Sequence, residues 1–406
     1  MATRKLSTAR TLGVHLIGGL GDIATTLVVG NAAIARGLAS RTGLVTDLSP
    51  LNQLGLIEPG GLAFGGVDIR PGTPLAAAES VYRASRTFSR ELLDAVNDDL
   101  AALESAFACD PSLSWGGAST PADPPLDEIA ATQRARLRAL GRGHDGLVVV
   151  NLASAEPLPP ESTCLGELDA LEAAIAANRK DLVTPAMLAM YCACSEGAAY
   201  INFTPNVGPE LGSLRALARA RGVPYYGSDG KTGETLVKTA LAPMFAWRNL
   251  QVLSWEGVNL LGNNDGRTLA EPQRRTAKLR NKRDVLEKLL GYPLHSEVAI
   301  NYVPSLGDWK TAWDLIHFRG FLDVPMTMQF TWQGCDSVLA APIVLDMVRL
   351  ADLARRRGEA GPMRHLACFF KNPLDVDEAG LHAQYAALAE YAGERAGRPL
   401  KQQLKP

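Results

Sequence analysis

The sequence lacks most of the features that mark secreted, membrane-spanning or nucleic-acid-binding proteins. Its six cysteines form no C-x-x-C pair and have no zinc-binding spacing. No apolar run approaches the roughly 20 residues of a membrane span. The basic residues form no block and the net charge is -2, which argues against a nucleic-acid surface. We therefore expect a cytoplasmic protein with reduced thiols.

Length and composition fit an ordinary globular enzyme. The chain has 406 residues, which exceeds the size at which one hydrophobic core stops growing, and 47% of its residues are apolar. The basic start, with Arg4 and Lys5, precedes an apolar run. That run contains His15 and no small-residue cleavage site follows it, so we interpret it as a buried strand and not as a signal peptide.

The first half of the chain alternates between apolar strands and helical segments. Strands are predicted at 12–17, 146–152, 199–203 and 223–226, and helical segments at 23–38, 76–107, 165–177 and 185–195. This alternation predicts an α/β fold with a Rossmann-like, doubly wound parallel sheet.

After about residue 236 the pattern changes. Strands are predicted at 250–255, 296–302 and 326–331, before a strong helical pattern at 340–356. We therefore expect residues 1–235 to form the Rossmann-like domain and residues 236–339 to form an inserted α+β domain. Residues 340–406 should return to the first domain.

A glycine turn directly follows the first predicted strand. It contains the pattern Gly19-x-Gly21-x-x-Ala24. Glycines here let N–H groups at a helix N-terminus approach a pyrophosphate, which favours a dinucleotide over a tight turn without a ligand. An acidic residue should end the second strand, and Asp47 is a loose candidate for it.

Lysine is scarce in this chain. Only 11 of the 41 basic residues are lysines, and seven of them fall between Lys231 and Lys371. A buried Lys can lose its proton whereas Arg cannot, so this clustering favours proton-transfer chemistry. Lys278 and Lys282 are four residues apart on a predicted helix, where mutual repulsion would favour loss of one proton. A solvated basic face is the alternative.

Two polar turns complete the set of candidate sites. Gly227 to Thr235 combines small residues, hydroxyls and Lys231 at a strand's carboxyl end, which suits a phosphorylated substrate. A helix-capping turn is the alternative. The second turn, which alone is ordinary loop chemistry, contains Asn263, Asn264 and Asp265.

Together these segments resemble the myo-inositol-1-phosphate synthase family, and its archaeal-type branch more than its longer eukaryotic members. The matching segments run in family order along the whole chain. They are GGLGDIATTLVVG at 18–30, INFTPN at 201–206, GSDGKTGETLVKT at 227–239, LLGNNDG at 260–266, KLRNK at 278–282, YVPSLGDWK at 302–310, CDSVLAAPIVLD at 335–346 and FFKNPL at 369–374.

The resemblance implies a cyclisation in which NAD is recycled. Bound NAD⁺ would oxidise C5 of D-glucose 6-phosphate, a proton would leave C6, the enolate would attack the C1 aldehyde, and C5 would then be reduced again. The product would be 1D-myo-inositol 3-phosphate. A homotetramer assembled through the inserted domain is also implied. The apolar strand 326–332 fits such an interface, and an internal core strand is the alternative.

The resemblance also implies roles for individual residues, with Lys278 acting at the C5 oxygen, Lys371 at the aldehyde oxygen, and Lys282 and Lys310 balancing the phosphate and the enolate. The implied catalytic residues are Lys278, Lys282, Lys310, Lys371, Asp229, Asp265 and Asp336. The implied cofactor-binding residues are Gly18, Gly19, Leu20, Gly21, Asp22, Ile23, Ala24, Asp229 and Asp336. The implied substrate-binding residues are Lys231, Thr232, Gly233, Glu234, Thr235, Asn263 and Asn264.

Glu234 departs from the family pattern, which has Gln at this place in the phosphate loop. A carboxylate beside a phosphate is unfavourable unless a cation lies between them. Glu234 therefore suggests a divalent metal ion as a further cofactor.

Three other functions are compatible with these residues. The same mechanism could act on another sugar phosphate, such as fructose 6-phosphate, and give a different carbocycle. The glycine turn alone would also suit a plain NAD-dependent dehydrogenase, or an NAD-binding scaffold without turnover. Four lysines at family positions in an Arg-preferring chain argue against the scaffold.

Overall fold

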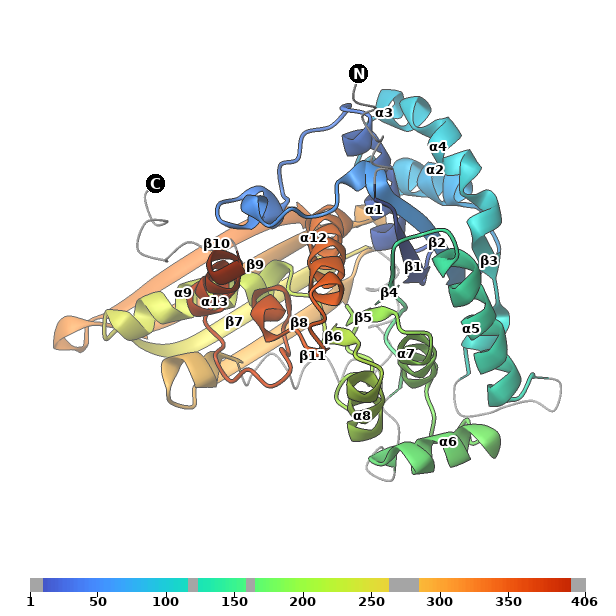
Figure 1. The fold of residues 1–406 in the computed structure, drawn as a ribbon. Helices are drawn as coiled ribbons and strands as arrows, with labels where there is room; N and C mark the ends of the chain where they lie inside the picture. Colours follow the sequence, from blue (N-terminus) through green and yellow to red (C-terminus); the bar gives the residue numbers. More distant parts are fainter. Residues whose placement is uncertain (1–9, 116–122, 158–164, 263–284, 396–406) are drawn as a thin grey trace, which may run out of the picture.

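One part of the molecule is built on a seven-stranded parallel sheet (Figure 1). The computed structural model describes residues 10–115, 123–157, 165–262 and 285–395. The strand order is β11-β6-β5-β4-β1-β2-β3, and every neighbouring pair is parallel. The strands are β1 (Leu12–Ile17), β2 (Leu62–Asp68), β3 (Phe107–Cys109), β4 (Leu147–Asn151), β5 (Ala199–Asn202), β6 (Pro224–Gly227) and β11 (Gly361–Pro362).

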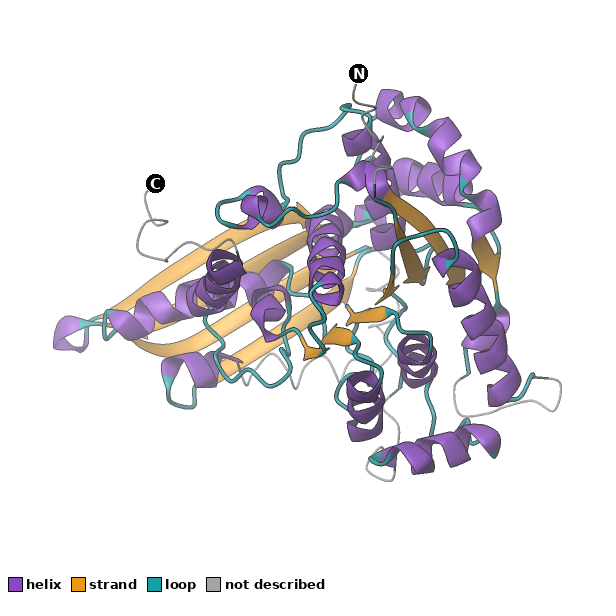
Figure 2. Ribbon diagram, in the orientation of Figure 1, coloured by secondary structure: helices purple, strands orange, loops and turns teal. Residues whose placement is uncertain are grey.

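Helices cover this sheet, as Figure 2 shows. The helix α12 packs against β4, β5 and β6 and alongside α1, whereas α5 and α7 pack against β1, β4 and β5. The helices are α1 (Asp22–Ala35), α2 (Pro74–Ser85), α3 (Arg90–Ala95), α4 (Asn97–Ala102), α5 (Leu126–Gly141), α6 (Leu168–Ala176), α7 (Pro185–Ser195), α8 (Gly212–Ala220), α9 (Gly233–Trp247), α12 (Asp336–Arg356) and α13 (Leu381–Arg395). The predicted Rossmann-like α/β fold is confirmed.

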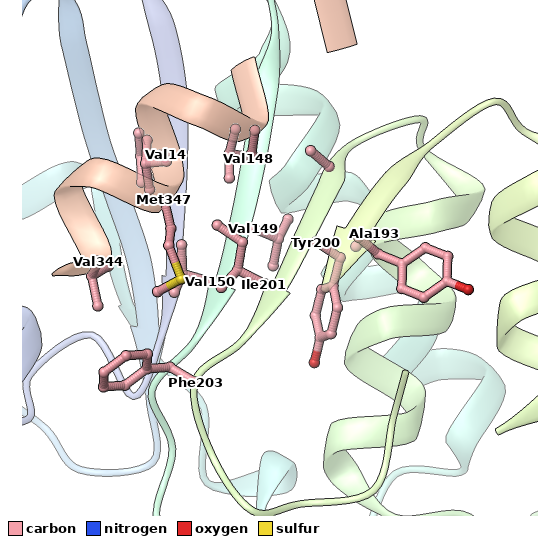
Figure 3. Packing of buried hydrophobic residues seen from close by; sticks show 14 of the residues in the cluster. Val14, Val148, Val149, Val150, Ala193, Tyr200, Ile201, Phe203, Val344 and Met347 are labelled. Atoms are coloured by element: carbon pink, nitrogen blue, oxygen red, sulfur yellow. The ribbon is translucent and has the colours of Figure 1, made fainter. Parts of the chain in front are cut away.

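The main core lies between the central strands and their helices. All five residues of β4 are buried, which is expected of a parallel strand covered on both faces. Figure 3 shows Val344 and Met347 of α12 beside Val14 of β1 and Val148 of β4. This packing fixes the start of α12 close to the carboxyl ends of the strands.

A second sheet has four strands, in the order β10-β9-β7-β8. Only the β7–β8 pair is parallel. Its strands are β7 (Gln251–Leu261), β8 (His295–Tyr302), β9 (Trp309–Arg319) and β10 (Pro325–Cys335). On one face, Ala242 and Phe245 of α9 pack with Trp255 and Ile316 in a separate apolar cluster. The helix α9 therefore leads from the first sheet to the second.

The structure differs from the sequence-based expectation at four strands. The prediction of a helical segment across 76–107 is wrong at its end, where β3 begins, and β2, β9 and β11 were not predicted. In β2, Gly65 and Gly66 interrupt the apolar pattern. A Cβ at Gly66 would lie 2.7 Å from the Leu16 carbonyl oxygen, so this strand needs a bare backbone to approach β1.

The sequence also predicts that the chain has no membrane span and that its cysteines are reduced. In the part of the chain that the structure describes, no helix is long and apolar enough to cross a bilayer. The described cysteines are unbridged, and Cys164 lies outside the described residues.

Candidate active site

A cavity of about 560 Å³ lies at the carboxyl ends of β1, β2 and β4. The chain leaves β1 toward β2 on one side and later enters β4 on the other. Such a switch point is where open α/β sheets bind their ligands. The cavity is therefore the expected location of an active site.

The predicted glycine turn borders this cavity. Gly18 has a φ of 75°, and a Cβ there would lie 2.9 Å from the Leu152 carbonyl oxygen, so only glycine fits. The N-cap of α1 is Gly21, and the first-turn N–H groups after it have no partner within the helix. The cavity-lining residues of this segment are Gly18, Gly21, Asp22, Ile23 and Ala24.

Two residues of the turn, Gly19 and Leu20, contact the end of β2 and not the cavity. The N–H group of Gly19 donates to the Val67 carbonyl oxygen at 3.0 Å, and that of Leu20 donates to Asp68 Oδ2 at 3.0 Å. Neither Gly19 nor Leu20 lines the cavity. Their bonds hold the turn against the end of β2.

Asp68 is a cavity-lining residue that the sequence analysis missed. It ends β2, the strand next to β1, and also accepts two bonds of 3.0 Å from Arg70. Burial alone would raise the pKa of Asp68, but the hydrogen bonds from Arg70 and Leu20 outweigh burial and lower it. Asp47, the earlier candidate, instead lies in a short helical turn and pairs with Arg41. Asp68 therefore takes the place that the sequence analysis gave to Asp47.

Asp229 and Lys371 meet at the cavity from distant parts of the sequence. The Lys371 ammonium donates to Asp229 Oδ1 at 2.9 Å, and the Lys371 N–H donates to the Asp229 carbonyl oxygen at 2.7 Å. The N–H of Asp229 in turn donates to the Thr204 carbonyl oxygen at 2.9 Å. Both charged side chains line the cavity, so this pair joins the end of β6 to the segment before α13.

Lys310 reaches the same cavity from the second sheet. Its Nζ atom would lie 2.9 Å from a Cβ built on Gly233, whose φ is 63°. The bare backbone of Gly233 thus lets an ammonium group approach the first turn of α9. The N-cap of that helix, Thr232, makes no side-chain capping bond. A cation and helix N–H groups therefore converge at one place, which favours an anion.

The remaining residues of the predicted phosphate loop divide into two groups. Thr232, Glu234 and Thr235 line the cavity, whereas Lys231 does not. Lys231 is only 2% exposed, and its ammonium donates to Gln384 of α13. The structure therefore places Lys231 behind the loop, where it joins the loop to α13.

A pH-dependent stability is expected from Lys231. Burial lowers its pKa from 10.5 to about 8. At Lys231 the unfolded chain then binds more protons than the native protein between these pH values, so the contribution of Lys231 to the unfolding free energy should rise with pH there, by roughly 3 kcal/mol in total. Urea unfolding of the parent and of Lys231→Met from pH 7 to pH 10 measures this. An identical pH slope in both proteins would contradict it.

Asp336 is the first residue of α12 and lines the cavity. Its Oδ1 atom is buried and has no hydrogen-bond partner among the described residues. The adjacent Ser337 accepts from Thr26 of α1 at 3.1 Å. An acceptor of this kind requires a donor, which a ligand in the cavity can supply.

Other predicted site residues lie outside the part of the chain that the structure describes. They are Asn263, Asn264, Asp265, Lys278 and Lys282.

The suggestion of a divalent metal finds no support in the described side chains. Within the described ranges, no group of three or more His, Cys, Asp or Glu residues could hold a metal ion. Among the described residues, Lys238 places a cation beside Glu234, with its Nζ atom 2.7 Å from Glu234 Oε1. The carboxylate in the phosphate loop thus has an ammonium partner from its own helix.

Known proteins resemble this chain in sequence and in structure. The family model for myo-inositol-1-phosphate synthase matches residues 233–337. Inositol-3-phosphate synthase 1 of Bacteroides thetaiotaomicron is 32% identical over 387 residues, which covers 89% of each chain. Inositol-3-phosphate synthase from Caenorhabditis elegans superimposes with a TM-score of 0.83 at 22% identity, covering 98% of this chain and 88% of that one. A myo-inositol-1-phosphate synthase-related protein from Thermotoga maritima gives a TM-score of 0.76 at 22% identity, covering 95% and 99%.

The structural likeness shows a shared fold, and the sequence identity over most of both chains shows common membership. The chain therefore belongs to the myo-inositol-1-phosphate synthase family, whose members are enzymes of the isomerase kind.

Proposed function

We propose that this enzyme converts D-glucose 6-phosphate to 1D-myo-inositol 3-phosphate by an NAD-dependent isomerising cyclisation. One observation carries the proposal: a single cavity is bordered by a dinucleotide-type glycine turn, by Lys310 and Lys371, and by the first turn of α9. A redox cofactor, proton-transferring groups and a phosphate would thus share one space. Family membership supports the same reaction.

NAD fits the residues at the glycine end of the cavity. The first-turn N–H groups of α1 would bind the pyrophosphate, and Asp68 lies where Rossmann-like folds bind the ribose hydroxyls. The buried Oδ1 atom of Asp336, which lacks a partner in the described residues, would accept a further hydrogen bond. When bound, NAD would supply hydride removal and return at C5 of the substrate.

The phosphate of the substrate would lie at the start of α9. Lys310, Thr232 and Thr235 border this place together with the helix N–H groups. Lys371 would then stabilise the aldehyde oxygen during ring closure, and Asp229 would hold the Lys371 ammonium in place. By family resemblance, Lys278, Lys282, Asp265, Asn263 and Asn264 would complete the site from outside the described residues.

The proposed contact of Asp68 with the ribose of NAD can be tested by measuring NAD affinity. We expect Asp68→Ala to weaken NAD binding by about 10- to 100-fold, because a charge-assisted ribose contact is lost and the Leu20 N–H loses its acceptor. Fluorescence titration with NADH measures it. Asp47→Ala is the matched control and should bind NADH as the parent does. Equal affinities for all three proteins would contradict the assignment.

The overall reaction is tested with two sugar phosphates. The enzyme with NAD⁺ is incubated separately with glucose 6-phosphate and fructose 6-phosphate, and the product is identified by NMR. Inositol phosphate from glucose 6-phosphate, without net absorbance gain at 340 nm, is expected. A different carbocycle from fructose 6-phosphate alone would support the alternative substrate. Steady accumulation of NADH would indicate a plain dehydrogenase.

The second sheet is the proposed site of homotetramer assembly. Its edge strand β10 is exposed along most of its length, and Phe321, Leu322 and Val324 before it are 89%, 78% and 50% exposed. Apolar side chains gathered at an edge are typical of an interface between subunits. We accordingly propose residues 236–339 as the catalytic and tetramerisation domain, and 1–235 with 340–406 as the NAD-binding domain. Mass measurement in solution tests the tetramer.

A further inference from the structure

A buried ion pair joins the proposed phosphate loop to the next turn of α9. Glu234 and Lys238 are 2% and 1% exposed, and the Lys238 Nζ atom lies 2.7 Å from Glu234 Oε1. The other carboxylate oxygen, Oε2, accepts a hydrogen bond of 2.5 Å from Asn259 of β7. Glu234 lines the cavity, whereas Lys238 does not. Only the carboxylate of this pair thus borders the substrate space.

Residues of β7 in the second sheet pack around this ion pair. The Lys238 ammonium lies over the Trp255 ring, 5.8 Å from its centroid, and the Trp255 indole N–H donates to Asp314 Oδ1 at 2.8 Å. Gly257 gives the carboxylate its room, because a Cβ there would come within 2.5 Å of Glu234 Oε1. A side chain at 257 would therefore push Glu234 out of its pairing position.

The ion pair offsets the repulsion that the Glu234 carboxylate would exert on a bound phosphate. A carboxylate next to a bound phosphate places two negative charges together, and at low effective dielectric their repulsion is large. Lys238 sits one helical turn after Glu234, on the same face of α9. Its ammonium can balance the carboxylate from behind while the helix N–H groups stay directed at the substrate.

We propose that Lys238 is a positioning residue that neutralises Glu234, so that the loop binds a phosphate despite its carboxylate. This inference rests on the proposed phosphate site. It gives Lys238 no contact with substrate, and it makes the need for Lys238 conditional on the charge at position 234. The predicted signature is that loss of Lys238 is harmful with Glu at 234 and harmless with Gln at 234.

The experiment is a double-mutant cycle read out by phosphate binding. Inorganic phosphate is titrated calorimetrically into the NAD-loaded parent, Lys238→Met, Glu234→Gln and the double variant. Lys288→Met, which removes an exposed ammonium, is the control. We expect Lys238→Met to bind phosphate at least about tenfold more weakly, because a buried carboxylate that has lost the ammonium group of Lys238 then faces the anion. The double variant should return to within about threefold of the parent.

Two outcomes would overturn the proposal. One is parent-like phosphate affinity in Lys238→Met. The other is a folded double variant that stays as weak as Lys238→Met, since Lys238 would then act directly on phosphate or on the fold. Should Lys238→Met fail to fold, the double variant alone decides. If the parent binds phosphate but does not cyclise glucose 6-phosphate, the proposed reaction fails separately, and the cycle still tests the role of Lys238.

Discussion

Lys371→Ala is expected to lose turnover by a factor of about 10² to 10⁴ while it binds NAD as the parent does, because it removes one proton-transferring and charge-stabilising group from the reacting end of the cavity. The Lys371 ammonium lies 2.9 Å from Asp229 Oδ1, and the backbone of the same residue is fixed by a bond to the Asp229 carbonyl oxygen. Truncation at Cβ leaves that backbone bond in place, so the loop should keep its shape.

Product formation from glucose 6-phosphate, followed by NMR, measures the loss. NADH titration and thermal unfolding establish that the variant is folded and binds its cofactor. Lys288→Ala, at an exposed position, should keep parental turnover. Lys371→Arg keeps the positive charge but cannot release a proton, so it should also be slow if proton transfer is the role. Turnover near the parental value in Lys371→Ala would remove Lys371 from the proposed mechanism.

The parts of the fold that the sequence predicts well are those with strong local signals. The helix α7 was predicted with the observed bounds, because Thr184 caps it and Pro185 stands at its first position. The strand β1 and the glycine turn were also placed correctly, since an apolar strand followed by glycines and a helix is typical of the first βα unit.

The missed parts depend on contacts between distant segments. The strand β2 contains two adjacent glycines, and the need for Gly66 becomes clear only from its close approach to Leu16 of β1. In Rossmann-like folds the acidic residue that ends the second strand usually follows the glycine turn by about twenty residues. Here it follows by about fifty, because residues 36–61 form loops and short helical turns between α1 and β2. Asp68 therefore lies outside the range in which the sequence pattern predicts it. The run LAFGGVD at 62–68, an apolar segment ending in Asp, was the available signal.

The candidate site shows the same division. The glycine turn is a local pattern, whereas the meeting of Asp229 with Lys371 spans 142 residues and follows from the paths of two loops. The pairing of Glu234 with Lys238 lies between these cases. Its spacing of four residues on one helix face is visible in the sequence. Its importance becomes visible only because the structure shows that both side chains are buried.

The buried carboxylate of Asp346 carries the largest expected effect on stability. It lies in α12, is 0% exposed, and accepts hydrogen bonds from the N–H groups of Val45 at 2.6 Å and Thr46 at 3.3 Å. Arg349, which is 3% exposed, lies beside it and donates to Thr46 and to the Ile57 carbonyl oxygen. Asp346 thus ties the loop after α1 to the helix that begins with Asp336.

Asp346→Ala should lower the free energy of unfolding by about 3 to 5 kcal/mol, because it leaves buried N–H donors unpaired and removes a charge partner of Arg349. Burial raises the pKa of Asp346 to about 6. The native Asp346 therefore binds an extra proton below that pH, and its contribution to stability rises as the pH falls. The difference in unfolding free energy between the parent and Asp346→Ala should consequently widen below pH 6. Urea unfolding at pH 7 and pH 5 measures both effects. Asp377→Ala, at an exposed carboxylate, is the control, and a deficit below about 1 kcal/mol for Asp346→Ala would show that the loop is held by other contacts.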